Sequence, residues 1–569
     1  MTIKRCSLTN SGCSGINGLI PSICVSLWLV WLTFFAGTPV YGYDIPGFSE
    51  AKFKDTYREF GEERKRQLVT KNLNEQSTLK SGFKSEVVYR HLYLYIHRDG
   101  STDTYYDIAQ KANSPDTKQM IGEPGILFDS SRETVSFLKA VVYTHSGREV
   151  ESDTMEAIEK SPFTGLVYSD LKVKSLSVKG LEDGAVVRVA YRRTSKPTEE
   201  MGFIHERINM AVGIPLKESI SVIEIESGTP VTISEKLKKA VTDIQKKDYK
   251  LENGNSVYIY KATNLRPEEK ELFSVPLPEY SNHISLLTPT TWDNIARWYH
   301  GKSIEMMNPD KEITGKAREL TDSLKNEPDR IKALYDYVRN IRYVSITLDQ
   351  HRLIPHEAPA TFRNQYGDCK DKSTLLISLL KSIGIRSYIC LVNTRTLIDK
   401  SEATPKAFNH AIVAIPYRGF YTFLDPTSTT TPYGYTPQYL EHRNGLIIKE
   451  GEGDFVLIPA DGPDKEAQSV SIKMEIISLT KAKIAMRTVL DGSSDLAKAF
   501  DGVSTDRIKQ NMARLMSARF GETHVESIDV RKGHEKEKEQ LITDLTIVVE
   551  NALKKMGDFY SIQGLTLSN

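Results

Sequence analysis

The order of apolar and polar residues changes along the chain and divides it into parts with different predicted structures. Between Val87 and Ile96 the pattern has a period of two, which predicts a strand, and Arg98-Asp99-Gly100 then marks a turn. Similar runs recur at Thr134–Tyr143, Val173–Val178, Val186–Tyr191, Ile220–Glu226 and Val257–Thr263. Many short strands joined by Gly-containing turns predict a β-sandwich-like domain over residues 85–270, called the strand-rich domain below.

Residues 291–460 mix helical and strand periods and form the predicted central domain. An apolar run from Leu375 covers most of the circumference of a helix that begins at Cys369 and ends before Gly384. Further helices are predicted at Trp292–Tyr299, Ile313–Leu324 and Asp329–Ile341, and strands at Tyr343–Ile346, Ser387–Val392, Ala411–Pro416 and Phe420–Leu424.

The remaining segments connect or flank these two domains. Residues 43–84 are highly charged and are predicted to form a helical lead-in with a solvated face, while residues 271–290 contain three prolines and predict a linker. Residues 461–569 are predicted to form a small α+β module. Its strands are expected at Val470–Ile477, Lys483–Leu490 and Leu541–Val549, and its helix at Asp495–Phe520.

The first candidate for a reactive residue is Cys369, at the start of its helix. Asp368 stands at the N-cap position, and Asp371 can complete a capping box with it. Cys369 is then the first helical residue, where unpaired N–H groups and the helix dipole favour a thiolate. Because the two aspartates oppose this effect, the thiol also needs a base.

Two later residues supply a base and a group to orient it. His410 opens the strand Ala411–Pro416, and Asp425 closes the strand Phe420–Leu424, so antiparallel pairing can place them side by side. Each residue alone is more often structural: a Cys before an apolar helix is usually a small buried residue, and Asp-Pro is usually a turn. Their joint order at element boundaries favours a nucleophile, a base and an orienting carboxylate.

Several motifs together resemble a known family. They are Tyr366–Ser373 (YGDCKDKS), Phe408–Val413 (FNHAIV), Phe423–Thr427 (FLDPT), Tyr335–Arg339, Ile341–Val344 and Trp292–Tyr299. These stretches are similar to the transglutaminase-like superfamily, and most of all to the bacterial subgroup that carries an N-terminal DUF3857 domain. The resemblance implies a papain-like fold with the triad Cys369, His410 and Asp425. The predicted fold class is therefore α+β, with a transglutaminase-like core between a β-sandwich-like domain and a small α+β module.

This combination predicts a thiol enzyme that acts on amide or acyl bonds of a peptide or protein substrate. The reaction could be proteolysis, deamidation or acyl transfer, and the triad does not distinguish among them. The amide of Cys369 would donate to the oxyanion, and a second donor is expected within Ile341–Gln350, with Tyr343 and Gln350 as candidates. The alternative is a non-catalytic binding or scaffold protein with an enzyme-like core.

The N-terminus predicts export. Lys4 and Arg5 precede the apolar stretch Ile23–Ala36, and Val40-Tyr41-Gly42 forms a possible cleavage site, so residues 1–42 resemble a secretory signal peptide. The predicted location is the periplasm or the outer face of the envelope. The bulky Trp28 and Trp31 leave an uncleaved membrane anchor open as the alternative.

Composition and cysteine content narrow the possible partners. The chain has 75 Lys and Arg against 74 Asp and Glu, so its net charge of +1 gives no electrostatic signature of nucleic-acid binding. Of its five cysteines only Cys369 and Cys390 follow the signal segment, and both are expected to be free. Zinc-site spacings and EF-hand loops are absent from the sequence, so no cofactor or metal is predicted. The sequence does not predict an oligomeric state.

Overall fold

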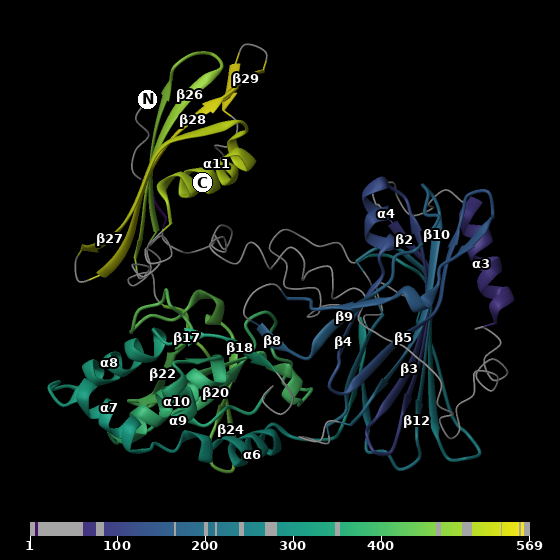
Figure 1. Cartoon of the computed structure of the whole chain (residues 1–569), viewed down its shortest axis with the longest axis horizontal. Coiled ribbons are helices and arrows are strands. Elements are labelled where there is room, and N and C mark those ends of the chain that lie inside the picture. The colour runs from purple at the N-terminus through teal and green to yellow at the C-terminus, as the bar shows by residue number, and fades with distance from the viewer. Residues whose placement is uncertain are drawn as a thin grey trace.

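The structure is a computed structural model of the whole chain and contains a strand-rich domain, a central domain and a C-terminal module (Figure 1). It describes residues 6–8, 61–74, 85–163, 167–197, 203–210, 213–237, 244–267, 282–347, 353–461, 468–491, 503–535, 538–556 and 559–562. Apart from β1 (Cys6–Leu8), the predicted signal segment lies outside the described residues.

The largest element of the strand-rich domain is an eight-stranded sheet with the order β14-β15-β12-β2-β3-β10-β5-β6. Its neighbours are antiparallel except for the parallel pair β12 and β2. In sheet order the strands are Ile244–Lys250, Ser256–Leu265, Leu216–Ile225, Ser85–Ile96, Thr102–Ala112, Val186–Ser195, Glu133–Tyr143 and Glu149–Glu151.

A second layer packs on one face of this sheet. It consists of α4 (Pro115–Gly122) and two three-stranded sheets, which have the orders β4-β9-β7 and β11-β16-β13. These strands are β4 (Gly125–Asp129), β9 (Leu171–Ser175), β7 (Ile158–Lys160), β11 (His205–Asn209), β16 (His283–Leu287) and β13 (Thr232–Lys236). Leu94 and Val189 of the large sheet share one buried cluster with Ile126 and Leu286 of the second layer. This two-layer packing confirms the β-sandwich-like prediction.

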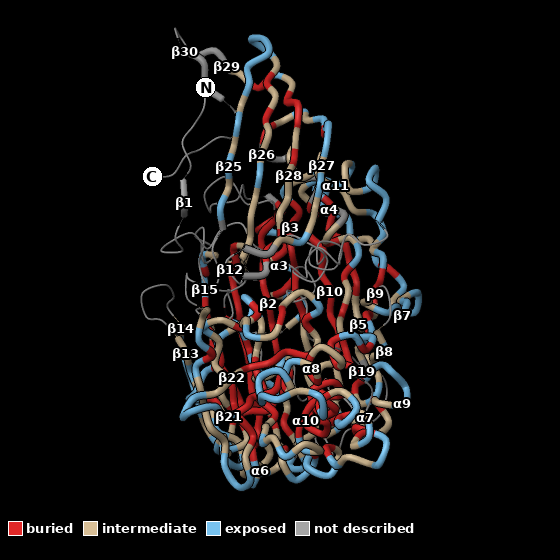
Figure 2. The backbone as a smooth tube through the Cα atoms, turned by 90° about the vertical axis from the view of Figure 1, so that its left-hand side faces the viewer, coloured by how far each residue is buried: buried red, intermediate tan, exposed pale blue. Residues whose placement is uncertain are grey.

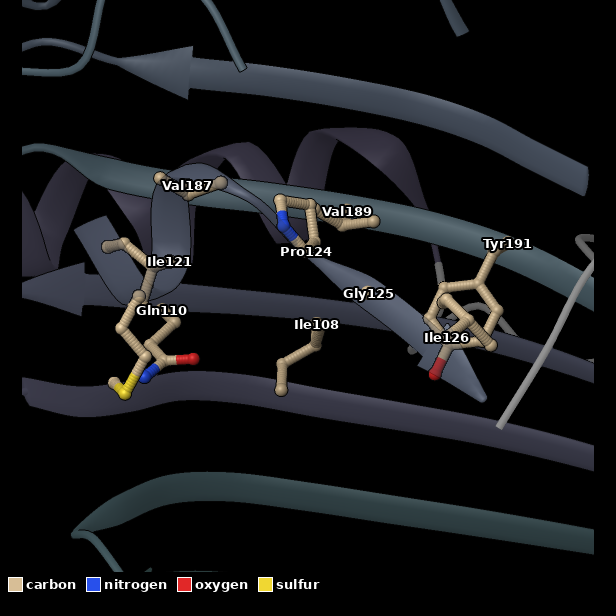
Figure 3. Close-up of a pocket in the computed structure, with 10 residues that line it drawn as sticks. Ile108, Gln110, Ile121, Pro124, Gly125, Ile126, Val187, Val189 and Tyr191 are labelled. Atoms are coloured by element: carbon tan, nitrogen blue, oxygen red, sulfur yellow. The ribbon is translucent and has the colours of Figure 1, made fainter. Parts of the chain in front are cut away.

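A small cavity lies between the two packed layers (Figure 3). Ile108, Val187 and Val189 of the large sheet face Ile121 and Ile126 across it. Its volume is about 20 Å³, which is room for about one water molecule. It is therefore a gap in packing, too small for an organic ligand.

The other face of the large sheet carries α3 (Glu62–Asn74), and here the predicted solvated face is wrong in part. Lys65 is 2% exposed and donates to the buried Asp107 at 2.7 Å, and Arg188 joins Asp107 to Glu62. Val69 is fully buried on the same side of the helix. Charged residues can be buried here because each has an opposite charge on the sheet.

The predicted linker also needs correction. Residues 282–290 are described, and they include β16, which is buried along its whole length between β11 and β13. The strand-rich domain therefore extends to Leu287 rather than ending at residue 270. The flanking prolines suggested a loop, but the buried segment His283–Leu287 is the central strand of a small sheet.

The central domain packs helices against a five-stranded antiparallel sheet with the order β22-β21-β20-β23-β24. α10 (Cys369–Ser382) lies against β21 and is surrounded by α7, α8 and α9. The sheet strands are β20 (Tyr388–Val392), β21 (His410–Tyr417), β22 (Phe420–Leu424), β23 (Asn444–Ile448) and β24 (Gly453–Leu457). The helices are α6 (Trp292–Ser303), α7 (Lys311–Thr321), α8 (Glu327–Arg339) and α9 (Ala358–Asn364), and the short strands are β17 (Arg342–Tyr343), β18 (Ser345–Thr347) and β19 (Tyr366–Gly367).

The C-terminal module is a sheet with the order β1-β25-β26-β28-β27 and one packed helix, α11 (Thr505–Phe520). Its strands are β25 (Gln468–Ile476), β26 (Lys481–Asp491), β27 (Thr523–Glu535) and β28 (Lys538–Glu550), followed by a hairpin of β29 (Leu553–Met556) and β30 (Phe559–Ile562). Strand β27 was not predicted from the sequence pattern. Figure 2 shows that this module is less buried than the two larger domains.

Candidate active site

The N-terminus of α10 carries the predicted nucleophile. The side chain of Asp368 accepts hydrogen bonds from the amides of Lys370 and Asp371, and the side chain of Asp371 accepts one from the amide of Asp368. This reciprocal pair is the predicted capping box, and it makes Cys369 the first residue of the helix. Cys369 is a partly exposed free thiol at the positive end of the helix dipole.

Basic side chains contact the two carboxylates beside the thiol, Asp368 and Asp371. The amide of His356 donates to Asp371 at 2.9 Å, and its Nδ1 lies 3.2 Å from the same oxygen. Burial alone would raise the pKa of Asp371, but the hydrogen bonds of His356 and the charge of Lys370 outweigh it and lower that pKa. Lys370 also donates to Asp368. Each aspartate that opposed a thiolate in the sequence analysis therefore has a basic partner, Lys370 for Asp368 and His356 for Asp371.

β21 and β22 bring His410 and Asp425 together. His410 begins β21, Asp425 directly follows β22, and the antiparallel register pairs Val413 with Leu424. The distance from His410 Nε2 to Asp425 Oδ2 is 2.7 Å. Asp425 is fully buried, while the side chain of His410 is 13% exposed. The carboxylate thus holds one ring nitrogen of a histidine that solvent can still reach.

The imidazole also contacts the thiol. Cys369 is one of the groups that raise the pKa of His410, so the thiol lies within interaction range of the ring, and since Nε2 is held by Asp425, Nδ1 is the nitrogen left to face the sulfur. Burial would lower the pKa of His410, but the charge of Asp425 and the hydrogen bonds of Asp425 and Cys369 outweigh it and raise that pKa well above its usual value. The fold therefore brings the three predicted site residues to one place, with a direct hydrogen bond between His410 and Asp425.

Asp425 has two further donors that the sequence analysis missed. Thr427 donates through its amide at 2.8 Å and its hydroxyl at 2.7 Å, and the Tyr439 hydroxyl donates at 2.7 Å. Burial opposes ionisation, but His410 and these donors outweigh it and lower the pKa of Asp425 to about 2. The Asp-Pro-Thr turn is a local signal for Thr427. Tyr439 comes from the following loop and has no local signal.

The loop that follows Asp425, residues 426–443, is tied to α8. Arg339 Nε donates to the carbonyl of Ser428 at 2.8 Å, and the Tyr335 hydroxyl donates to the carbonyl of Thr431 at 3.2 Å. Tyr439 then reaches Asp425 from this loop, and its ring lies edge-on to the His410 ring at 6.5 Å. The loop therefore forms one side of the site.

Of the two candidates for the second oxyanion donor, Tyr343 and Gln350, the structure describes only Tyr343. Gln350 lies outside the described residues. Burial and the charge of Cys369 raise the pKa of Tyr343, and strand β17 pairs this residue with Gly367, two positions before Cys369. Burial and the charge of Cys369 act in the same direction on the pKa of Tyr299, which the sequence analysis did not single out. The charge of Cys369 thus acts on two tyrosines from different elements, Tyr343 of β17 and Tyr299 of α6.

Lys372, one turn into α10, is a second residue that the sequence analysis left unassigned. Its Nζ donates to the carbonyl of Ile341 at 2.8 Å and to that of Arg339 at 3.2 Å. Burial lowers the pKa of Lys372 to about 8, although the charge of Asp425 opposes this. The lysine thereby joins α10 to the end of α8 and to Ile341, two residues before Tyr343.

In the part of the chain that the structure describes, no group of three or more His, Cys, Asp or Glu residues could hold a metal ion. Within the same residues, none of the helices is both long and apolar enough to cross a membrane.

Comparison with family models assigns two of the three parts. The transglutaminase-like superfamily model matches residues 314–426, which include the whole Cys–His–Asp chain. The central domain belongs to the transglutaminase-like superfamily. The model of DUF3857, a domain of unknown function with a solved structure, matches residues 98–269. The protein therefore has the architecture of a DUF3857 domain followed by a transglutaminase-like domain.

One solved structure supports the fold assignment. A "putative protease" from Parabacteroides distasonis matches with a TM-score of 0.54 and 15% identity, covering 82% of this chain and 93% of the other. A "putative cysteine protease" from Cytophaga hutchinsonii is 15% identical over 39% of this chain and 79% of the other, with a TM-score of 0.18. Comparison with the curated proteins found no match. The first similarity shows a shared fold over most of the chain.

Proposed function

We propose that the protein is an exported thiol enzyme that cleaves or transfers amide or acyl groups of a peptide or protein substrate. The proposal rests mainly on one observation: His410 is hydrogen-bonded to the buried Asp425 at 2.7 Å, and Cys369, the first residue of α10, lies close enough to His410 to raise its pKa. This is the relation of nucleophile, base and orienting group that acyl-transfer catalysis requires. The superfamily assignment supports the same class of chemistry.

The residues would act in sequence. Cys369 Sγ attacks the carbonyl carbon as a thiolate, and His410, which holds the thiol proton, delivers it to the leaving amine as the C–N bond breaks. Water or a second amine then attacks the thioester, gives its proton to His410 and releases Cys369. Asp425 orients the imidazole and stabilises its charged form throughout.

The oxyanion would be stabilised at the start of α10. The capping box engages the amides of Lys370 and Asp371 and leaves the amide of Cys369 outside it. That amide is the first proposed donor, and Tyr343 is the second because β17 pairs it with Gly367, two positions before Cys369.

A pH series of alkylation tests this function. An ordinary thiol, with a pKa of about 8.5, is mostly protonated at pH 6 and reacts slowly. Because the pKa of His410 is raised, the imidazolium should persist through neutral pH and keep Cys369 reactive at pH 6. Turnover, which also needs the imidazolium proton, should fall only as the pH rises through that raised pKa. Iodoacetamide labelling followed by peptide mass spectrometry measures the first effect.

Cys390 is the internal control for this experiment. It is fully buried, and burial raises the pKa of its thiol, so labelling in the folded protein should be slow at every pH. Slow and equal labelling of Cys369 and Cys390 would instead favour the non-catalytic binding protein.

Export rests on the N-terminal sequence pattern, and the expected mature chain begins near Tyr43. N-terminal sequencing of protein from cells expressing the full-length chain checks this. A product that still contains Trp28 and Trp31 would show that the segment is retained as an anchor.

A further inference from the structure

The loop that leads into His410 is bound to the strand-rich domain. This His410 loop, residues 393–409, joins β20 to β21. Near its middle, Glu402 is 7% exposed and reaches the sheet β11-β16-β13. It accepts hydrogen bonds from Ser234 Oγ at 2.8 Å and Ser285 Oγ at 3.1 Å, and it lies 3.4 Å from Lys236 Nζ.

Further contacts bind the same loop to the same sheet. Lys236 also pairs with Asp399. Lys406 Nζ donates to the carbonyl of His205 at 2.9 Å. The His410 loop therefore touches all three strands of the small sheet.

The charge of Glu402 makes this docking specific. Burial would raise the pKa of Glu402, but Ser234, Lys236 and Ser285 outweigh it and lower that pKa. A buried carboxylate is costly unless such partners surround it. The loop therefore has one favoured position on the sheet, where Glu402 keeps its partners.

The last residues of the His410 loop, Phe408 and Asn409, connect the docked part of the loop to His410. The amide of Asn409 donates to the carbonyl of Val392 at 3.1 Å, and its side chain accepts from the amide of Thr394 at 2.9 Å. Phe408 packs against Trp292 with ring centroids 5.9 Å apart. A shift of the loop on the sheet would therefore reach the residues directly before His410.

A second contact holds the cysteine side of the site. β8 (Val167–Ser169) comes from the strand-rich domain but pairs in parallel with β18 of the central domain (Figure 1). The segment before β18 pairs with β19, whose last residue, Gly367, lies two positions before Cys369. The amide of Val344 donates to the carbonyl of Gly367 at 3.1 Å. The strand-rich domain thus contacts both halves of the site.

We propose that the strand-rich domain is a clamp that holds the His410 half of the active site against the Cys369 half, with Glu402 and Lys236 as positioning residues. This inference rests on the proposed function. Neither residue touches the reacting atoms; each acts through the His410 loop. The DUF3857 domain then has a defined task, which is to keep the thiol and the imidazole within hydrogen-bonding reach.

The test compares Glu402→Gln and Lys236→Met with the matched control Glu235→Gln in the full chain. Glu235 lies on β13 beside Lys236 but pairs with Lys246 and Tyr260, away from the His410 loop. For the two clamp variants we expect alkylation of Cys369 at pH 6 to slow on the order of 10- to 100-fold, as for other remote displacements of catalytic groups. At pH 9.5, where any exposed thiol is ionised, the rates should match wild type. Glu235→Gln should match wild type at both values.

Hydrogen exchange gives a readout that does not depend on catalysis. Amides in residues 393–413 should exchange faster in the clamp variants than in wild type, while those of β23 and β24 should not change. Unchanged exchange and unchanged alkylation in folded Glu402→Gln and Lys236→Met would overturn the clamp. A wild-type Cys369 that reacts no faster than Cys390 at pH 6 would overturn the proposed function instead, and hydrogen exchange would still decide the clamp.

Discussion

Replacing Cys369 with Ala is expected to abolish turnover while leaving the fold stable. The change removes one sulfur atom from a partly exposed position, and the capping box of Asp368 and Asp371 that starts α10 remains. The loss should be on the order of 10⁶-fold, the scale of removing the nucleophile from an acyl-transfer triad. The measurement is steady-state kinetics on any amide or acyl substrate that the wild type turns over, with a thermal melt to check folding.

The thiol and its base should behave as one unit in the same assay. His410→Ala should be nearly as severe as Cys369→Ala, because a thiol without its base is mostly protonated near neutral pH. The double variant should be little worse than either single variant. Cys390→Ala is the matched control, and since Cys390 packs in a separate buried cluster, it should cost stability rather than turnover. Full activity in Cys369→Ala, or single losses that multiply, would favour the binding-protein alternative.

Local sequence signals were sufficient for the part of the site that α10 supplies. The cap residue Asp368, the apolar run from Leu375 and the terminal Gly384 lie close together in sequence, and each acts on neighbouring backbone. The structure accordingly has the helix at Cys369–Ser382 with the predicted capping box. β22 was also predicted with its observed ends, because its hairpin with β21 is local.

Signals were missing where the partner is distant in sequence. β16 looked like part of a linker because its neighbours β11 and β13 lie far from it along the chain. Lys65 looked solvated because its partner Asp107 lies on a strand 42 residues away. Tyr439 had no signal because a loop of no regular pattern carries it to Asp425. Composition and periodicity depend only on residues that are close in sequence. The places of β16, Lys65 and Tyr439 depend instead on partners that are distant in sequence.

The division into domains was less sharp than the sequence suggested. β8 pairs with the central domain, and the His410 loop docks on a sheet that includes β16. Strand-rich and central parts therefore share hydrogen bonds on both sides of the candidate site. A boundary drawn at a proline-rich stretch does not separate two independent units here.

Asp425→Asn is expected to lower turnover by about 10²–10⁴-fold, which is large but incomplete. The amide keeps the size of the carboxylate, so the fully buried side chain should still fit between Thr427 and Tyr439. The substitution removes the charge that contributes to the raised pKa of His410. With that pKa lowered, less imidazolium is present near neutral pH, so the alkaline limb of the activity profile should move to lower pH.

Tyr439→Phe separates the charge of Asp425 from its orientation. This variant removes one hydrogen bond to Asp425 but keeps the carboxylate and the aromatic ring beside His410. A hydrogen bond to a charged group contributes about 1.5–3 kcal/mol, so the loss of turnover should be milder, about 10- to 100-fold. Because the pKa of Asp425 is about 2 and the carboxylate stays ionised at neutral pH, the alkaline limb should move little. Both variants are compared by pH profiles of turnover and of Cys369 alkylation. Wild-type profiles in Asp425→Asn would show that the buried carboxylate supports the fold of the loop rather than the chemistry of His410.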